Sequence, residues 1–163
     1  MSDWQVRLNQ MGTGVFIAVT LFGAITFSDA SKAIVVAVDL GLAAIGVFAF
    51  LLGYWTAVQR SRTRQMSVAE LYFLMGSAIP SGVKRPMNIL LLVQTTVALV
   101  TAMSRLTTPV AGGGATNGST LAFGVLVPVL GLGLNGLWAA THGAFPPRAL
   151  KEPKRDIGDP EIG

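Results

Sequence analysis

Asp39 is the residue best suited to chemistry in this chain, because it is the one charged residue inside four long apolar stretches. An ionised carboxylate within a bilayer costs about 2.5–3.5 kcal/mol on insertion scales, so an intramembrane Asp is by default a functional candidate. Ala43, Gly46 and Gly53 share its helical stripe, and such small residues suit close helix contact. We therefore expect the carboxylate to face other helices rather than lipid.

Three roles for Asp39 are open at this stage. Buried charges are normally paired, and Thr101 and Arg105 lie at a similar depth, near the end of the third apolar stretch. The first alternative is a structural ion pair between Asp39 and Arg105. The second is a neutral or hydrogen-bonded side chain, and the third is a role in handling protons or cations.

Two amides, Gln94 and Asn135, are the other polar candidates within the apolar stretches. From helical rise, Gln94 lies about 10 Å into the third stretch and Asn135 about 8–9 Å from the end of the fourth, so the two side chains could meet. A hydrogen bond of this kind in lipid is worth about 0.6–2 kcal/mol. Helix association is therefore favoured over ligand binding as the role of these amides.

Composition and pattern exclude several common chemistries. The chain has no Cys and one His, His142, which excludes disulfide relays, iron–sulfur centres, cysteine zinc sites and a bis-histidine haem within one chain. The run at 131–136 matches a dinucleotide-binding pattern, but it lies inside an apolar stretch rather than after a β-strand. No Ser-His-Asp or paired-carboxylate arrangement is readable. We therefore predict no catalytic residues, no cofactor and no metal.

Membrane helices are the elements that must position these residues. Of 163 residues, 52% are hydrophobic and only 12% charged, and every charged residue except Asp39 lies outside the four apolar stretches. The sequence thus predicts an all-α polytopic membrane protein with four transmembrane helices, at about residues 8–27, 33–58, 87–104 and 120–141. Pro128 is expected to bend the fourth helix.

The distribution of basic residues predicts an orientation, because positively charged loops stay in the cytoplasm. Placing both termini and the second loop inside leaves only Lys32 and Arg105 of the 12 Lys and Arg residues outside. Trp4, Trp55 and Trp138 then fall at the cytoplasmic boundary, where aromatic anchors are typical. We expect a multi-pass protein of the cell membrane with both termini cytoplasmic.

The second loop is predicted to contain a further short helix. Ser67 and Glu70 form a capping-box pattern, and apolar residues recur at helical spacing as far as Ile79. We therefore expect an interfacial amphipathic helix over about residues 67–79, on the cytoplasmic leaflet. The basic residues that flank this helix are Arg60, Arg62, Arg64, Lys84 and Arg85. One interpretation is that they bind anionic lipid head groups or an acidic partner. The favoured interpretation is that they only set the topology. Nucleic acid is not an expected partner.

Residues 1–145 are predicted to form one membrane domain. Residues 146–163 are rich in proline and charge and are expected to be a disordered cytoplasmic tail, and the glycine-rich third loop at 105–119 a flexible external linker. An alternative for the first apolar stretch is a cleaved signal peptide that ends at the Ser28-x-Ala30 pattern. This alternative is less favoured, because Arg7 is the one basic residue before the stretch and Asp3 balances it.

The Gly-Leu-Trp-Ala-Ala-Thr-His-Gly-Ala-Phe-Pro-Pro-Arg stretch at 136–148, with the four spans and the glycine-rich loop, resembles small four-span integral membrane proteins of actinobacterial type. The resemblance implies the membrane fold and no particular activity. From the small-residue helix faces we expect a non-catalytic accessory or stabilising subunit that associates with another membrane protein or with itself. The alternative is a small oligomeric transporter or channel that uses Asp39.

Overall fold

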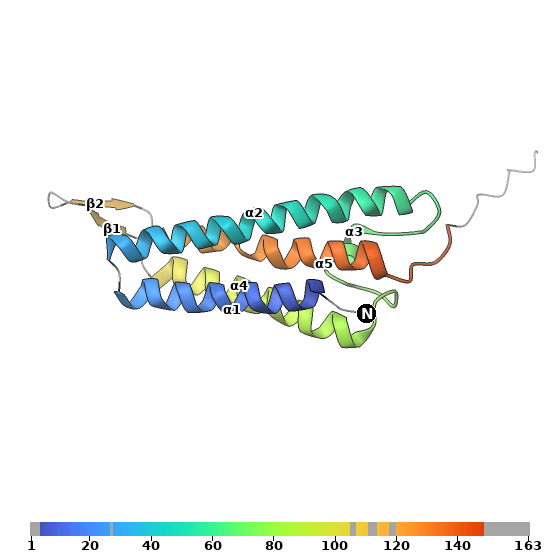
Figure 1. The fold of residues 1–163 in the computed structure, drawn as a ribbon, viewed down its shortest axis with the longest axis horizontal. Helices are drawn as coiled ribbons and strands as arrows, with labels where there is room; N and C mark the ends of the chain where they lie inside the picture. Colours follow the sequence, from blue (N-terminus) through green and yellow to red (C-terminus); the bar gives the residue numbers. More distant parts are fainter. Residues whose placement is uncertain (1–3, 27, 105–106, 111–113, 118–119, 149–163) are drawn as a thin grey trace, which may run out of the picture.

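A computed structural model describes residues 4–26, 28–104, 107–110, 114–117 and 120–148. Four long helical segments lie side by side along one axis (Figure 1). They are α1 (Trp4–Thr26), α2 (Asp29–Arg60), α4 (Ser81–Ser104), and a fourth segment in which η1 (Thr120–Leu126) is followed by α5 (Pro128–His142). All four are long and apolar enough to cross a membrane, in agreement with the predicted four-span helical architecture.

The two ends of the bundle carry different elements and different charge. At one end, β1 (Thr107–Val110) pairs antiparallel with β2 (Gly114–Asn117), so part of the predicted flexible linker is a two-stranded hairpin. We call this the hairpin end, and the other the basic end. Among the described residues, the basic end carries seven Lys and Arg side chains and the hairpin end carries Lys32; the seven are Arg7, Arg60, Arg62, Arg64, Lys84, Arg85 and Arg148.

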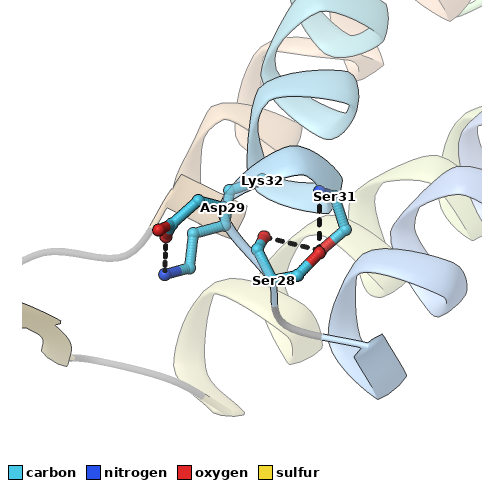
Figure 2. A network of polar contacts seen from close by, with 4 residues as sticks. All are labelled: Ser28, Asp29, Ser31 and Lys32. Carbon is cyan, nitrogen blue, oxygen red and sulfur yellow. Dashed lines mark hydrogen bonds and ion pairs between the residues drawn. The ribbon is translucent and has the colours of Figure 1, made fainter.

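Helix α2 begins at the hairpin end with a capped first turn (Figure 2). The backbone N–H of Ser31 donates to the hydroxyl of Ser28 at 3.1 Å, and Lys32 pairs with Asp29 at 3.0 Å. An N-cap Ser and an acidic residue in the first turn both compensate unpaired N–H groups at the positive helix end. The helix therefore starts four residues earlier than the predicted span, and the Ser28-x-Ala30 pattern forms its cap.

The fourth span is not one continuous α-helix. Residues Thr120–Leu126 form a 3₁₀-helix, and α5 starts afresh with Pro128 in its first turn. Proline is suited to the first turn because its missing N–H has no helical partner there. Pro128 thus begins a helix, whereas the sequence predicted that it bends one.

The predicted interfacial helix over 67–79 is not confirmed. Its capping box is present at Ser67 and Glu70, but α3 (Val68–Tyr72) is only five residues long. Leu74 and Gly76 then adopt positive φ angles of 53° and 86°, which turn the chain out of the helical conformation. The protein itself covers part of this segment at the basic end of the bundle. The buried apolar residues are Leu71, Tyr72, Leu74, Ala78 and Ile79, whereas Val68, Phe73 and Met75 are exposed.

Two further expectations change at the basic end. Trp4 and Trp55 are exposed, but Trp138, which the sequence analysis grouped with them, is only 5% exposed and stacks on His142, with ring centroids 5.3 Å apart. The first residues of the predicted tail are paired with the second loop, since the N–H of Arg148 donates to the carbonyl of Thr63 at 3.0 Å. Residues 149–163 of the predicted disordered tail lie outside the described residues.

Candidate functional site

Asp39 lies inside the bundle, as its small-residue stripe predicted. Its side chain has no exposed surface, and within the described part of the chain neither carboxylate oxygen has a hydrogen-bond partner. The hydroxyl of Thr101, one expected partner, instead donates to the carbonyls of Val97 and Ala98 at 2.7 and 3.2 Å. Arg105, the expected ion-pair partner, lies outside the described residues.

The contact between α2 and α5 explains why Asp39 points inward. A Cβ atom added at Gly46 would lie 2.4 Å from the backbone nitrogen of Leu130, and one at Gly133 would lie 2.1 Å from the carbonyl oxygen of Gly46. The two backbones therefore touch at these glycines, and the rotation of α2 about its own axis is fixed. Asp39 precedes Gly46 by two turns on the same buried face, so this packing turns the carboxylate into the bundle.

The carboxylate lies beside the 3₁₀ segment and near the middle of the bundle. A Cβ atom at Gly124 of η1 would lie 3.5 Å from Oδ2 of Asp39 and 3.2 Å from Cε2 of Phe16, so both side chains lie against this glycine. Phe16 is fully buried, about 18 Å from the start of α1 and about 15 Å from its end by helical rise. Asp39 is thus level with the centre of α1. The predicted span, which begins at residue 33, would place it only about 9 Å from the outer end of that span.

A cluster of three buried polar residues lies between Asp39 and the basic end. Nε2 of Gln94 donates to Oδ1 of Asn9 at 2.9 Å and to the hydroxyl of Thr13 at 2.7 Å. We call these three residues the amide cluster. All three are buried, and within the described residues Oε1 of Gln94 and Nδ2 of Asn9 have no partner. The fourth span makes room for the amide through a glycine, since a Cβ at Gly131 would lie 2.7 Å from Oε1 of Gln94.

The α1 partners of Gln94 were missed in the sequence analysis, although a signal for them exists. Gln5, Asn9 and Thr13 recur every four residues, which places three polar side chains on one helical face within an otherwise apolar segment. The structure buries that face together with Phe16 and Thr20. A polar stripe on the inner face of α1 therefore leads from the basic end to the level of Asp39, interrupted by Phe16.

Asn135 does not meet Gln94, contrary to the contact that helical rise allowed. Its Nδ2 donates to the carbonyl of Tyr72 at 3.1 Å and to Oδ1 of Asn88 at 3.3 Å. The Tyr72 hydroxyl donates to the carbonyl of Phe50 at 3.3 Å, and burial raises the pKa of this hydroxyl above its usual range. Asn135 of α5 thus connects the end of α3 and the first part of α4 to the bundle, which is a structural role.

Part of the basic flank is also structural. Arg60 donates to the carbonyls of Ala140 and Gly143, and Nη1 of Arg64 donates to the carbonyl of Phe145 at 2.9 Å. Carbonyls at the end of a helix lack intrahelical partners and carry partial negative charge, so cations are stabilising there. Arg60 therefore caps the C-terminal end of α5. Lys84 donates to the carbonyl of Gly76 at 3.4 Å, and Arg62 and Arg85 are exposed.

Chemically, the site offers a carboxylate that can bind a proton or a cation and amides that can hydrogen-bond to water. Within the described ranges, no group of three His, Cys, Asp or Glu side chains is placed to hold a metal ion. Comparison with protein-family models, with curated proteins and with solved structures found no match to the chain. The function is therefore argued from this geometry alone.

Proposed function

We propose that the protein is a small membrane transporter or channel for protons or monovalent cations, in which Asp39 binds the transported ion. The observation that carries the proposal is the burial of both Asp39 oxygens without a partner in the described part of the chain. An ionised carboxylate in this state is costly, and binding a proton or a cation removes most of the cost. Ion binding at Asp39 therefore stabilises the helix arrangement in which the carboxylate is buried. Such a difference between arrangements is what couples ion binding to a conformational change.

The surroundings of Asp39 fit a path with a barrier. The polar stripe on α1 supplies hydrogen-bonding groups between the basic end and Thr13, and the buried ring of Phe16 follows about 4.5 Å further along the helix. An apolar constriction of this kind blocks water until it moves. The break between η1 and α5 lies next to Asp39, and discontinuous membrane helices commonly line ion sites.

The proposal includes the orientation predicted from the sequence, with both termini and the basic end in the cytoplasm of the cell. It is supported by the seven basic side chains at one end of the described structure, against Lys32 at the other. In this orientation the polar stripe on α1, whose side chains are buried, begins at the cytoplasmic end of the bundle, and the carboxylate lies between this stripe and the outer side.

The test is ion flux into proteoliposomes that contain a pH-sensitive dye, driven by a potassium diffusion potential. Wild-type protein is expected to conduct protons, and Asp39→Asn to lose the flux at equal reconstitution. Asp29→Asn is the matched control, because it removes the exposed acidic residue at the start of the same helix. Exchanging sodium for choline in the external buffer, with the potassium gradient unchanged, separates proton from sodium transport. Flux that persists unchanged in Asp39→Asn would contradict the proposal.

The accessory-subunit function expected from the sequence is the second candidate, and the structure changes its contact surface. Gly46 and Gly53 of α2 and Gly133 of α5 lie in the contact between these two helices, so they are not free to bind a partner. The large exposed apolar side chains on the outer face of α2, such as Ile45, Phe48 and Leu52, are the surface that a partner helix would cover. Mild-detergent purification tests this candidate: loss of copurifying proteins in Phe48→Ala with normal flux would favour it, and recovery of the chain alone would count against it.

A further inference from the structure

A polar cavity of about 330 Å³ opens at the basic end, where the second loop meets the segment after α5. It is lined by Ser61, Arg64, Gln65, Met66 and Arg148. Two of these five side chains are guanidinium groups, and within the described residues no carboxylate pairs with either of them. The cavity therefore has the charge of a site for an anion.

Both arginines are held in place by backbone carbonyls. Nη1 of Arg64 donates to the carbonyl of Phe145 at 2.9 Å, and Nη1 of Arg148 donates to the carbonyl of Ser61 at 3.2 Å. The bridge between Arg64 and Pro147, with the N–H of Arg148 bonded to Thr63, fixes the two chain segments relative to each other. A guanidinium group has five N–H donors, so each arginine keeps donors that can bind a phosphate in a fixed geometry.

An apolar groove of about 170 Å³ adjoins this cavity and shares Ser61 and Met66 with it. The groove runs along the last turns of α2 to α3, and its other lining residues are Tyr54, Ala57, Val58, Ser67, Val68, Leu71 and Tyr72. Tyr54 and the neighbouring Trp55 are more than half exposed, as aromatic residues at a membrane boundary are. A cationic cavity and an apolar groove thus adjoin each other at the basic end of the bundle.

We propose that this pair of surfaces binds one anionic phospholipid, with its phosphate between Arg64 and Arg148 and the start of an acyl chain in the groove. Two guanidinium groups attract the single negative charge of a phosphodiester and can donate hydrogen bonds to its oxygens, and a groove with an apolar lining matches a chain that has no hydrogen-bonding groups. Arg62, which lines a different cavity with Trp55, is not part of the site. The proposed binding therefore depends on the two arginines of the cavity, and a general attraction between the basic loop and anionic lipid does not account for it.

The test is native mass spectrometry of the full chain released from detergent that contains equal amounts of phosphatidylglycerol and phosphatidylcholine. Wild-type protein is expected to retain one phosphatidylglycerol in preference. Arg64→Ala and Arg148→Ala are each expected to lower the affinity for phosphatidylglycerol about tenfold, the effect of losing one hydrogen bond to a charged group. The matched control Arg62→Ala removes the same charge outside the cavity and should leave binding unchanged. Melting temperatures in detergent show whether each variant is folded.

The groove and the source of the phosphate are tested separately. Val68→Glu places a carboxylate at an exposed groove position in the first turn of α3, where an acidic residue favours the helix, so a folded protein with weaker lipid binding is expected. Adding millimolar inorganic phosphate should not displace the lipid. Three outcomes would overturn the proposal: an equal loss in Arg62→Ala, full displacement by free phosphate, or equal retention of the two lipids by wild-type protein.

Discussion

Replacing Asp39 with Asn is expected to stabilise the fold while abolishing ion flux. An ionised Asp at the centre of a membrane helix costs about 2.5–3.5 kcal/mol on insertion scales, and a buried amide without a partner costs about 1–3 kcal/mol. Both Asp39 oxygens are buried and unpaired among the described residues, and Asn has nearly the same shape, so no cavity opens beside Gly124. The difference between the central values predicts a gain of about 1 kcal/mol in the free energy of unfolding.

The measurement is equilibrium unfolding of both proteins in mixed micelles of dodecyl sulfate and a mild detergent, followed by circular dichroism. Asp29→Asn is again the control, and it should lower stability slightly, because an exposed ion pair contributes little. If Asp39→Asn instead lowered the free energy of unfolding by about 1 kcal/mol or more, the reasoning would fail. The carboxylate would then have a stabilising partner that outweighs its desolvation.

Three further substitutions follow from the contacts around the site. Phe16→Ala should raise proton flux in the liposome assay several-fold by opening the apolar barrier, and an unchanged rate would show that the ring does not limit flux. Gly133→Ala should destabilise the bundle by about 1–3 kcal/mol, because the added Cβ meets the carbonyl of Gly46; Gly41→Ala, where nothing lies within 4 Å, should be neutral or slightly stabilising. Gln94→Leu should cost about 1 kcal/mol in unfolding free energy through loss of its two side-chain hydrogen bonds, and equal stability would contradict their role.

The hydrogen-bond partners of the buried amides were the hardest features to predict from the sequence. Gln94 and Asn135 were recognised as polar residues in apolar segments, but their partners depend on how the helices are rotated and offset, which helical rise does not contain. Asn9 and Thr13 are identified as the partners of Gln94 only by the packing of α1 against α4. The periodicity of Gln5, Asn9 and Thr13 was nonetheless present, and it would have identified the polar face of α1.

The segment after Ser67 shows a different limit. Its capping box and apolar spacing predicted a helix of about 12 residues, and the cap did form. Helical spacing is a weak guide over one or two turns, because tertiary contacts can bury the same apolar residues without a helix. Tyr72 packs on Phe50 and is held by Asn135, and these contacts take the place of the membrane surface that the periodicity suggested.

The sequence by itself determined the class of the protein and the place of its functional candidate. Four apolar stretches and the exclusion of charge from them follow from the cost of placing charge in lipid, which holds whatever the helices do next. Only the tertiary structure decided what surrounds Asp39. The backbone contact between Gly46 and Gly133 fixes the rotation of α2, and this places the carboxylate beside Phe16 and a 3₁₀ segment. Such a contact joins residues 87 positions apart, and local spacing carries no information about it.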